Sequence, residues 1–297
     1  MFPLFDGLKL NYIYQNFVIF YGENMLKILL ITNDTYGDGE DSFLLQWLQR
    51  DFLVNLYDIS QPLPLNLTSF DLFLFRNAWP GRIYYRKIQK IVQIASENNI
   101  IIYNSLEQKS LQFPQKEYLY YLCELCPYVI PTYKNLADFP ENVPILIKPK
   151  NGGSSYGVQI FSNKQLIPQN LKLDNYILQE FLELKKEVSF YFIDKKFIYA
   201  LQTKQAGMNY RWDLQEFTPT DVMLNLAQYF VNWNDMKYGI DRIDFGLTYD
   251  DKLLLMEIES DRSYLSLEEL SSQTLTRFLD EFKKSLLLAY SHSRLII

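Results

Sequence analysis

Three carboxylates and one guanidinium are predicted to share one face of a strand pair near the end of the chain. Residues 240–259 form two apolar runs separated by a polar turn, which is the pattern of a β-hairpin. Side chains two positions apart on a strand point to the same face, so Arg242 and Asp244 lie together on the first strand. By the same rule, Glu257 and Glu259 lie together on the second strand.

The pairing of the two strands decides whether these four side chains meet. A hairpin that is symmetrical about residues 250–251 sets Asp244 opposite Glu257, and its next pair is Arg242 with Glu259. Carboxylates crowded on one sheet face repel each other and lose hydration, so a cation commonly neutralises such a cluster. Oxygen ligands without His or Cys suit Mg²⁺ that is bound together with phosphate groups. A solvated hairpin face without a metal is the alternative that these residues leave open.

The composition is that of a packed globular protein. A chain of 297 residues can bury a large core and divide into two or three lobes, and its 48% hydrophobic and 16% aromatic content argues against disorder. The net charge of -6 argues against a general nucleic-acid-binding protein. No apolar run reaches the roughly 18 residues that span a bilayer, and the first residues lack a basic secretory signal. We therefore expect a cytoplasmic protein without nucleic-acid or membrane partners.

Histidine and cysteine chemistry contributes little. The single His, His292, lies near the end of the chain, which excludes His-based triads and His-rich zinc sites. Cys123 and Cys126 form a CxxC pair, but they end a predicted helix before Pro127, whereas a thioredoxin-like site requires a strand-to-helix junction. We interpret them as a reduced, partly buried pair, with a redox or metal role as the open alternative.

Alternating strands and helices over residues 25–105 predict a small, Rossmann-like parallel α/β domain, preceded by an aromatic arm at residues 1–24. The predicted strands are residues 26–32, 54–59, 71–75 and 100–103, and the predicted helices are residues 43–53 and 84–98.

A glycine- and serine-rich loop, residues 150–157, follows a predicted strand that carries Lys148 near its end. Gly lets backbone amides approach an anion closely, and Lys adds a point charge for phosphate. An ordinary flexible loop is the alternative. Lys116 lies on a helix predicted for residues 115–125.

The remaining chain predicts antiparallel strands and two more helices. The predicted strands are residues 144–149, 158–161, 175–182, 188–193 and 197–203, and the predicted helices are residues 220–232 and 267–290. Residues 206–217 are predicted to form a mobile loop that contains Arg211.

In this order the pieces resemble the ATP-grasp superfamily of ATP-dependent carboxylate-amine ligases over roughly residues 105–290. The motifs are individually loose, and their order and spacing are more specific. The resemblance implies a pre-ATP-grasp domain at residues 25–105. It also implies a two-lobed ATP-grasp domain at residues 106–297, with a small lobe at 106–182 and a large lobe at 183–297.

The resemblance also implies roles for the nucleotide-binding residues. Lys116 and Lys148 match lysines that hold ATP phosphates, Glu187 matches the acidic residue that binds the ribose, and Lys204 fits one branch of the superfamily. The residues that match the flexible lid over the phosphates are Gly152, Gly153, Ser154, Ser155 and Gly157. The residues that match the hinge reading adenine through its backbone are Gln179, Glu180, Phe181 and Leu182.

The same resemblance assigns the reacting end of the site. Arg211 and Arg242 match arginines that meet the γ-phosphate or the acyl phosphate. The match to the magnesium ligands, for Mg²⁺ or Mn²⁺, comprises Asp244, Glu257 and Glu259.

The pattern departs from most members at Glu259, where they place Asn followed shortly by Pro. A Glu-x-Glu version resembles the branch of the D-cycloserine-forming ligase and distant relatives of glutathione synthetase and of the ribosomal-protein glutamate ligase. Glutamate still offers oxygen to Mg²⁺, so metal binding is retained in this interpretation.

The implied activity is amide-bond formation through an acyl phosphate, with ATP, a small carboxylate and an amine as partners. The carboxylate belongs to an amino acid, a peptide or a related small molecule. Two alternatives stay open: a non-catalytic ATP-binding module that acts through a partner protein, and a kinase-like enzyme that stops after phosphorylation. Homo-oligomer formation is a further open expectation.

Overall fold

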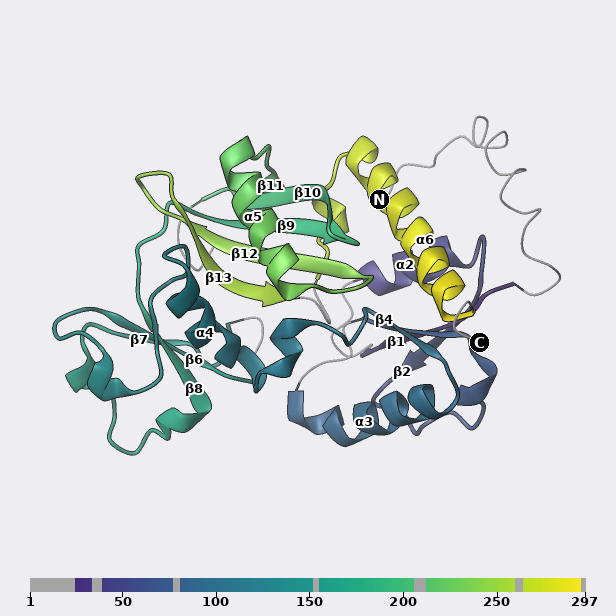
Figure 1. The fold of residues 1–297 in the computed structure, drawn as a ribbon, viewed down its shortest axis with the longest axis horizontal. Coiled ribbons are helices and arrows are strands. Elements are labelled where there is room, and N and C mark those ends of the chain that lie inside the picture. Colours follow the sequence, from purple (N-terminus) through teal and green to yellow (C-terminus); the bar gives the residue numbers. More distant parts are fainter. Residues whose placement is uncertain are drawn as a thin grey trace.

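The computed structural model of the protein describes residues 25–33, 39–76, 81–151, 155–205, 212–259 and 264–294, which form three sheets with helices between and around them (Figure 1). The predicted arm at residues 1–24 lies outside the described residues. Among the helices in these ranges, none combines the length and the apolar character that a bilayer-spanning segment requires.

The first sheet is parallel and contains four strands. Their spatial order is β2 (Leu53–Asp58), β1 (Lys27–Thr32), β3 (Leu72–Phe75) and β4 (Ile101–Tyr103). β3 is buried along its whole length, as expected for a parallel strand that is covered on both faces. Helix α3 (Gly81–Glu97) packs Ile91 and Ala95 against one face, and the other face is covered by α2 (Glu40–Leu48) and α6 (Ser272–Arg294) (Figure 1).

The second sheet is antiparallel and has five strands. Their spatial order is β11 (Leu214–Glu216), β10 (Lys196–Thr203), β9 (Lys186–Ile193), β12 (Ile240–Leu247) and β13 (Leu253–Glu259). Helix α5 (Asp221–Asn234) packs Phe230 and Val231 against one face. Phe278 and Phe282 of α6 lie in one buried cluster with residues of both sheets, so apolar burial joins the two sheets.

The third sheet, called the small sheet below, is antiparallel and has four short strands. The five-stranded sheet lies between it and the parallel sheet (Figure 1). The strands of the small sheet, in spatial order, are β5 (Thr132–Tyr133), β8 (Tyr176–Glu180), β6 (Ile145–Pro149) and β7 (Gln159–Phe161). Helix α4 (Tyr118–Leu125) leads into it. The segment before β5 is bonded to β13, because the Leu255 amide donates to the Tyr128 carbonyl at 2.7 Å and the Ile130 amide donates to the Leu255 carbonyl at 3.1 Å.

The predicted elements are present, with shifted ends. α2 covers residues 40–48 where the pattern predicted 43–53, and the predicted helix at 115–125 begins with a 3₁₀ turn, Gln115–Glu117. Thr220 caps α5, since its hydroxyl accepts from the Met223 amide. Cys123 and Cys126 are free thiols with intermediate burial.

One prediction about the loop at residues 206–217 was wrong. Residues 214–216 are not part of a mobile loop but form β11, which pairs with residues 201–203 at the edge of the five-stranded sheet. A three-residue edge strand has little period-two pattern, so its pairing depends on the neighbouring strand.

Candidate active site

The acidic hairpin has the predicted register. β12 and β13 pair antiparallel with Asp244 opposite Glu257 and with Arg242 opposite Glu259, as expected for a hairpin centred on residues 250–251. A register shift follows directly after Asp244, where Phe245 pairs with Leu255. The four charged side chains therefore lie on one face of two adjacent strands.

Arg242 is held by two of these carboxylates. Its Nε and Nη2 donate to the two oxygens of Asp244 at 3.0 and 2.9 Å, and Nη2 lies 2.7 Å from Glu259 Oε2. Nη1 donates to the Tyr264 carbonyl at 3.1 Å, and the guanidinium side chain is only 13% exposed. Its orientation is therefore set by three groups, which come from β12, from β13 and from the segment after β13.

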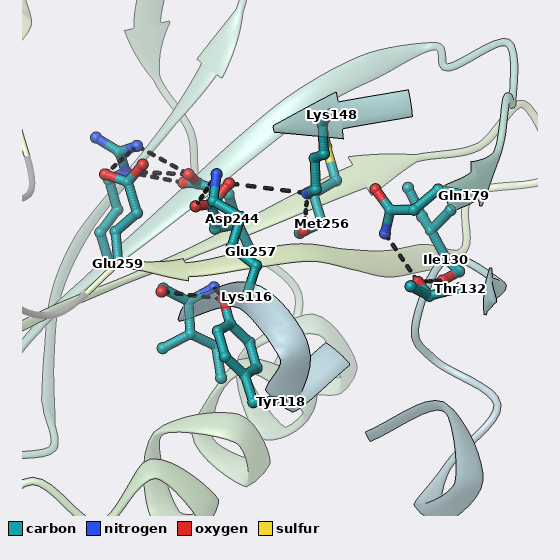
Figure 2. Close-up of polar contacts among 12 residues, drawn as sticks. Lys116, Tyr118, Ile130, Thr132, Lys148, Gln179, Asp244, Met256, Glu257 and Glu259 are labelled. Carbon is teal, nitrogen blue, oxygen red and sulfur yellow. Dashed lines mark hydrogen bonds and ion pairs between the residues drawn. The ribbon is translucent and has the colours of Figure 1, made fainter. Parts of the chain in front are cut away.

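Glu257 lies between two lysines that come from other elements (Figure 2). Lys116 Nζ, from the turn before α4, is 2.6 Å from Glu257 Oε1, and Lys148 Nζ, from β6, is 3.8 Å from Oε2. Lys148 also donates to the Met256 carbonyl at 2.9 Å. Three elements thus bring opposite charges together at one point.

Burial and neighbouring charge set different protonation tendencies within this cluster. Burial alone would raise the pKa of Glu257, but Lys116 and Lys148 outweigh it, so the pKa is lowered and the carboxylate is ionised. Burial raises the pKa of Glu259 to about 7 despite Arg242, with Glu257 and Asp244 adding repulsion. Burial lowers the pKa of Lys148 to about 8, and Glu257 opposes that shift.

The donor set fits a hard cation in its chemistry. Asp244, Glu257 and Glu259 offer only oxygen, the ligand type that Mg²⁺ prefers, and their mutual repulsion is what a cation would relieve. In the present arrangement, Lys116 and Arg242 supply the opposite charge. Within the described ranges, no group of three or more His, Cys, Asp or Glu side chains has a geometry that could hold a metal ion.

A cleft of about 750 Å³ opens at this cluster, between the five-stranded sheet and the small sheet. Its size is in the range of small-molecule sites. The predicted site residues that line it are Lys116, Lys148, Ser155, Gln179, Glu180, Phe181, Leu182, Glu187, Arg242, Asp244, Glu257 and Glu259. Of the residues predicted to form the hinge, Gln179 and Glu180 end β8, and Phe181 and Leu182 follow it. The Phe181 amide donates to the Pro144 carbonyl at 2.8 Å.

Comparison with solved structures identifies this architecture. The chain is similar to D-cycloserine synthetase DcsG, with a TM-score of 0.64 and 17% identity over 87% of this chain and 99% of that one. It is also similar to D-alanine–D-alanine ligase from Bacillus anthracis, with a TM-score of 0.64 and 13% identity over 90% of this chain and 99% of that one. The chain has the ATP-grasp fold.

Another similar ATP-grasp structure is the ligase PsnB in complex with a phosphomimetic variant of minimal precursor, Mg and ADP. Its TM-score is 0.59, with 14% identity over 90% of this chain and 100% of that one. Sequence comparisons find no match: no protein-family model and no curated protein matches the chain.

Some predicted residues do not line the ATP-grasp cleft. Lys204 is exposed and pairs with Asp213 at 2.7 Å. Gly157 is not part of the lining; its φ is +76°, and a Cβ added there would lie 2.9 Å from Pro149 Cγ, which explains why a glycine stands at this position. The predicted residues that lie outside the described residues are Gly152, Gly153, Ser154 and Arg211.

The cleft also contains residues that the sequence analysis missed. The Ser189 hydroxyl donates to Asp244 Oδ1 at 2.7 Å from the neighbouring strand β9. It lies two positions after Glu187, so period-two alternation in β9 was a usable signal. Tyr118 bridges to β13, since the Ile258 amide donates to its hydroxyl at 2.8 Å, and no local sequence signal indicates that contact.

Proposed function

We propose that the protein is an ATP-dependent ligase that joins a carboxylate to an amine through an acyl phosphate. The observation that carries this proposal is the convergence of Lys116 and Lys148 on Glu257 in the cleft, beside the paired Arg242 and Asp244, in a chain with the ATP-grasp fold. This set combines cations for phosphate with carboxylates for a metal. The described site requires no activated protein nucleophile for such chemistry.

The residues act by position and charge. A substrate carboxylate oxygen attacks the γ-phosphorus of ATP, the bond to the β-phosphate oxygen breaks, and ADP leaves. The amine then attacks the acyl carbon, loses a proton, and phosphate leaves. Lys116, Lys148 and Arg242 neutralise the phosphate oxygens during transfer, when charge spreads over them. Arg211 has the same role in the proposal.

Mg²⁺, or Mn²⁺ in its place, would be held by Asp244, Glu257 and Glu259 and would supply positive charge that neutralises phosphate oxygens during transfer. Lys116 would exchange Glu257 for a phosphate oxygen when the nucleotide enters, which would free this carboxylate for the metal. The complex of PsnB with Mg and ADP supports this pairing of nucleotide and metal, and the complex of the Bacillus anthracis ligase with ATP supports the choice of nucleotide.

The nucleotide would lie across the hinge. Gln179 through Leu182 would present backbone groups to adenine, and Glu187 would meet the ribose; their place in the cleft lining supports both assignments. The loop with Ser155 and Gly157, together with Gly152, Gly153 and Ser154, would close over the phosphates and exclude water. Lys204 would join the site only by leaving Asp213.

The test is hydroxylamine trapping. The protein is incubated with Mg-ATP, hydroxylamine and pooled amino acids or short peptides, while ADP release and hydroxamate formation are followed. Both products are expected, because hydroxylamine intercepts an acyl phosphate. Glu257→Gln is expected to abolish both, since the amide keeps the shape but not the charge.

Asp250→Asn is the matched control, because Asp250 is an exposed carboxylate on the turn of the same hairpin and pairs with Lys252. It should retain the wild-type rate. Unchanged turnover in Glu257→Gln would refute the assignment. ATP binding with neither product indicates the non-catalytic module, and ADP without hydroxamate indicates a kinase-like reaction.

The proposal extends to the organisation of the chain. We assign the parallel sheet to a Rossmann-like pre-ATP-grasp domain, residues 25–105, and the two other sheets to the small and large lobes, residues 106–182 and 183–297. A cytoplasmic location and self-association are predictions from the sequence. Size-exclusion chromatography with light scattering tests the second.

A further inference from the structure

A short segment after β13 lines one side of the cleft and contacts Arg242. This strap consists of residues 264–267, and Tyr264 and Ser266 line the cleft. The Tyr264 carbonyl accepts from Arg242 Nη1 at 3.1 Å. The position of the strap therefore helps to set the orientation of the guanidinium.

A buried ion pair from the parallel-sheet region holds this strap. Glu40, the first residue of α2, accepts from the Leu265 amide at 3.2 Å through Oε1 and from the Leu267 amide at 3.3 Å through Oε2. Arg76, directly after β3, pairs with the same carboxylate, and its Nε also donates to Asp41 at 3.2 Å. The Arg76 and Glu40 side chains are only 4% and 0% exposed.

The strap is anchored from the opposite side as well. The Tyr199 hydroxyl on β10 donates to the Leu265 carbonyl at 2.7 Å. Tyr199 stacks on Tyr191 with ring centroids 4.2 Å apart, and Tyr191 lines the cleft. Bonds to helix α2 and to the five-stranded sheet thus fix three consecutive peptide units of the strap.

The backbone of the strap needs such anchors. Ser266 has φ of +51°, a left-handed conformation that strains the backbone of a residue with a side chain. The amides on both sides of Ser266 are the ones that donate to Glu40. Burying an ion pair is an unreliable source of stability by itself, so a positioning role is a better account of this pair.

We propose that Glu40 and Arg76 are positioning residues for the reaction, because they hold the strap where the Tyr264 carbonyl orients Arg242 toward the transferring phosphoryl group. This inference rests on the proposed function. It makes the parallel-sheet region a contributor to the phosphoryl-transfer end of the cleft. The hinge and the two lysines, which lie on other elements, do not depend on it.

The experiment compares Glu40→Gln with a matched control, Lys283→Gln. Lys283 on α6 lies 2.8 Å from Asp51 in another ion pair with the α2 region, and that pair does not include the strap. Glu40→Gln keeps one acceptor of the two, so kcat for hydroxamate and ADP formation is expected to fall about tenfold, whereas KM for ATP changes less than about twofold. The control is expected to change neither.

A second readout does not require activity. Amide hydrogen exchange at one of the two amides, Leu265 or Leu267, should be about tenfold faster in Glu40→Gln than in the wild type or in Lys283→Gln, because the glutamine side chain keeps only one acceptor oxygen for the two amides. If Glu40→Gln does not fold, Tyr199→Phe decides, since it keeps the ring stacking and removes only the bond to the Leu265 carbonyl. Its kcat should fall about threefold, with KM for ATP unchanged.

Wild-type kcat in Glu40→Gln, or a loss no larger than that of the control, would overturn the positioning role. Exchange rates equal to those of the wild type would overturn the attachment of the strap. A wild-type protein that forms neither ADP nor hydroxamate refutes the proposed function instead, and the exchange measurement still reports on the strap.

Discussion

At the scale of residues, burial and neighbouring charge have opposite effects on the pKa of Glu257. Burial by itself would favour the neutral acid, but Lys116 at 2.6 Å and Lys148 at 3.8 Å lower the pKa of Glu257 and keep its carboxylate ionised. The same lysines are the phosphate ligands of the proposed reaction. A nucleotide would therefore take the lysines away from the carboxylate that a metal then neutralises, which couples the two binding events.

Asp241, the residue directly before Arg242, is a second buried acid. Its protonation state affects the free energy of unfolding. It is 0% exposed; Oδ1 accepts from Asn234 at 2.8 Å, and Oδ2 has no hydrogen-bond partner among the described residues. Burial raises its pKa from 3.8 to about 7, with Asn234 and Lys195 opposing and Asp194 adding repulsion. The folded protein thus binds this proton more tightly than the unfolded chain does.

Asp241→Asn is expected to stabilise the protein at neutral and higher pH. With a raised folded-state pKa, the contribution of Asp241 is most favourable below about pH 4 and is lost as the pH rises to about 7. The variant removes this loss, so its free energy of unfolding at pH 8 should exceed that of the wild type by about 2 kcal/mol. Urea unfolding at pH 5 and pH 8 measures this difference. An equal gain at both pH values would contradict the titration argument.

At the scale of elements, Asn104, directly after β4, bonds to the start of β12, and Gly239 leaves room for its side chain. Gly239 has φ of +135°, and a Cβ there would lie 2.6 Å from Asn104 Oδ1 and 2.8 Å from Asn104 Cβ. Asn104 bonds to both the amide and the carbonyl of Ile240, at 2.9 and 3.0 Å. This contact sets where the strand that carries Arg242 and Asp244 begins.

Gly239→Ala is expected to lower the free energy of unfolding by about 3 kcal/mol, because it combines backbone strain with displacement of Asn104. Gly39→Ala is the matched control: its φ is also positive, at +90°, but no atom lies within 4 Å of the added Cβ. It should cost about 1 kcal/mol. Equal losses in the two variants, measured by denaturant unfolding, would show that the Asn104 contact has no effect.

At the scale of the whole molecule, the cleft collects charged groups from the small sheet, the five-stranded sheet and the turn before α4. A ligand that bridges these parts stabilises the folded state by mass action. At about 100 times its Kd, a nucleotide contributes about 2.7 kcal/mol. Such a ligand would bind the folded chain and not the separate segments.

Mg-ATP is therefore expected to raise the Tm by several degrees, and ATP with a chelator is expected to raise it less, since the carboxylates repel an uncompensated triphosphate. Differential scanning fluorimetry measures both shifts. Glu257→Gln should narrow the difference between them because it removes a metal ligand. Equal shifts with and without Mg²⁺ in the wild type would argue against the metal site.

The sequence by itself determined the local part of this protein. Period-two alternation set Arg242, Asp244, Glu257 and Glu259 on one face, and the turn residues set their register, because both depend on neighbours along the chain. The order of motifs was sufficient for the ATP-grasp fold. Resemblance to a family motif did not determine whether a residue lies in the cleft, because Lys204 matches one but is exposed outside the cleft lining.

Only the tertiary structure decided which distant groups meet. The contacts of Lys116 and Lys148 with Glu257, of Ser189 with Asp244, and of Glu40 with the strap join segments far apart in the sequence. Alternation in β9 can set the face of Ser189, but no local pattern records which distant group a face meets. That depends on how α6 packs between two sheets and on how the small sheet attaches to β13. Strand periodicity predicts a face, whereas the packing of whole elements decides what that face meets.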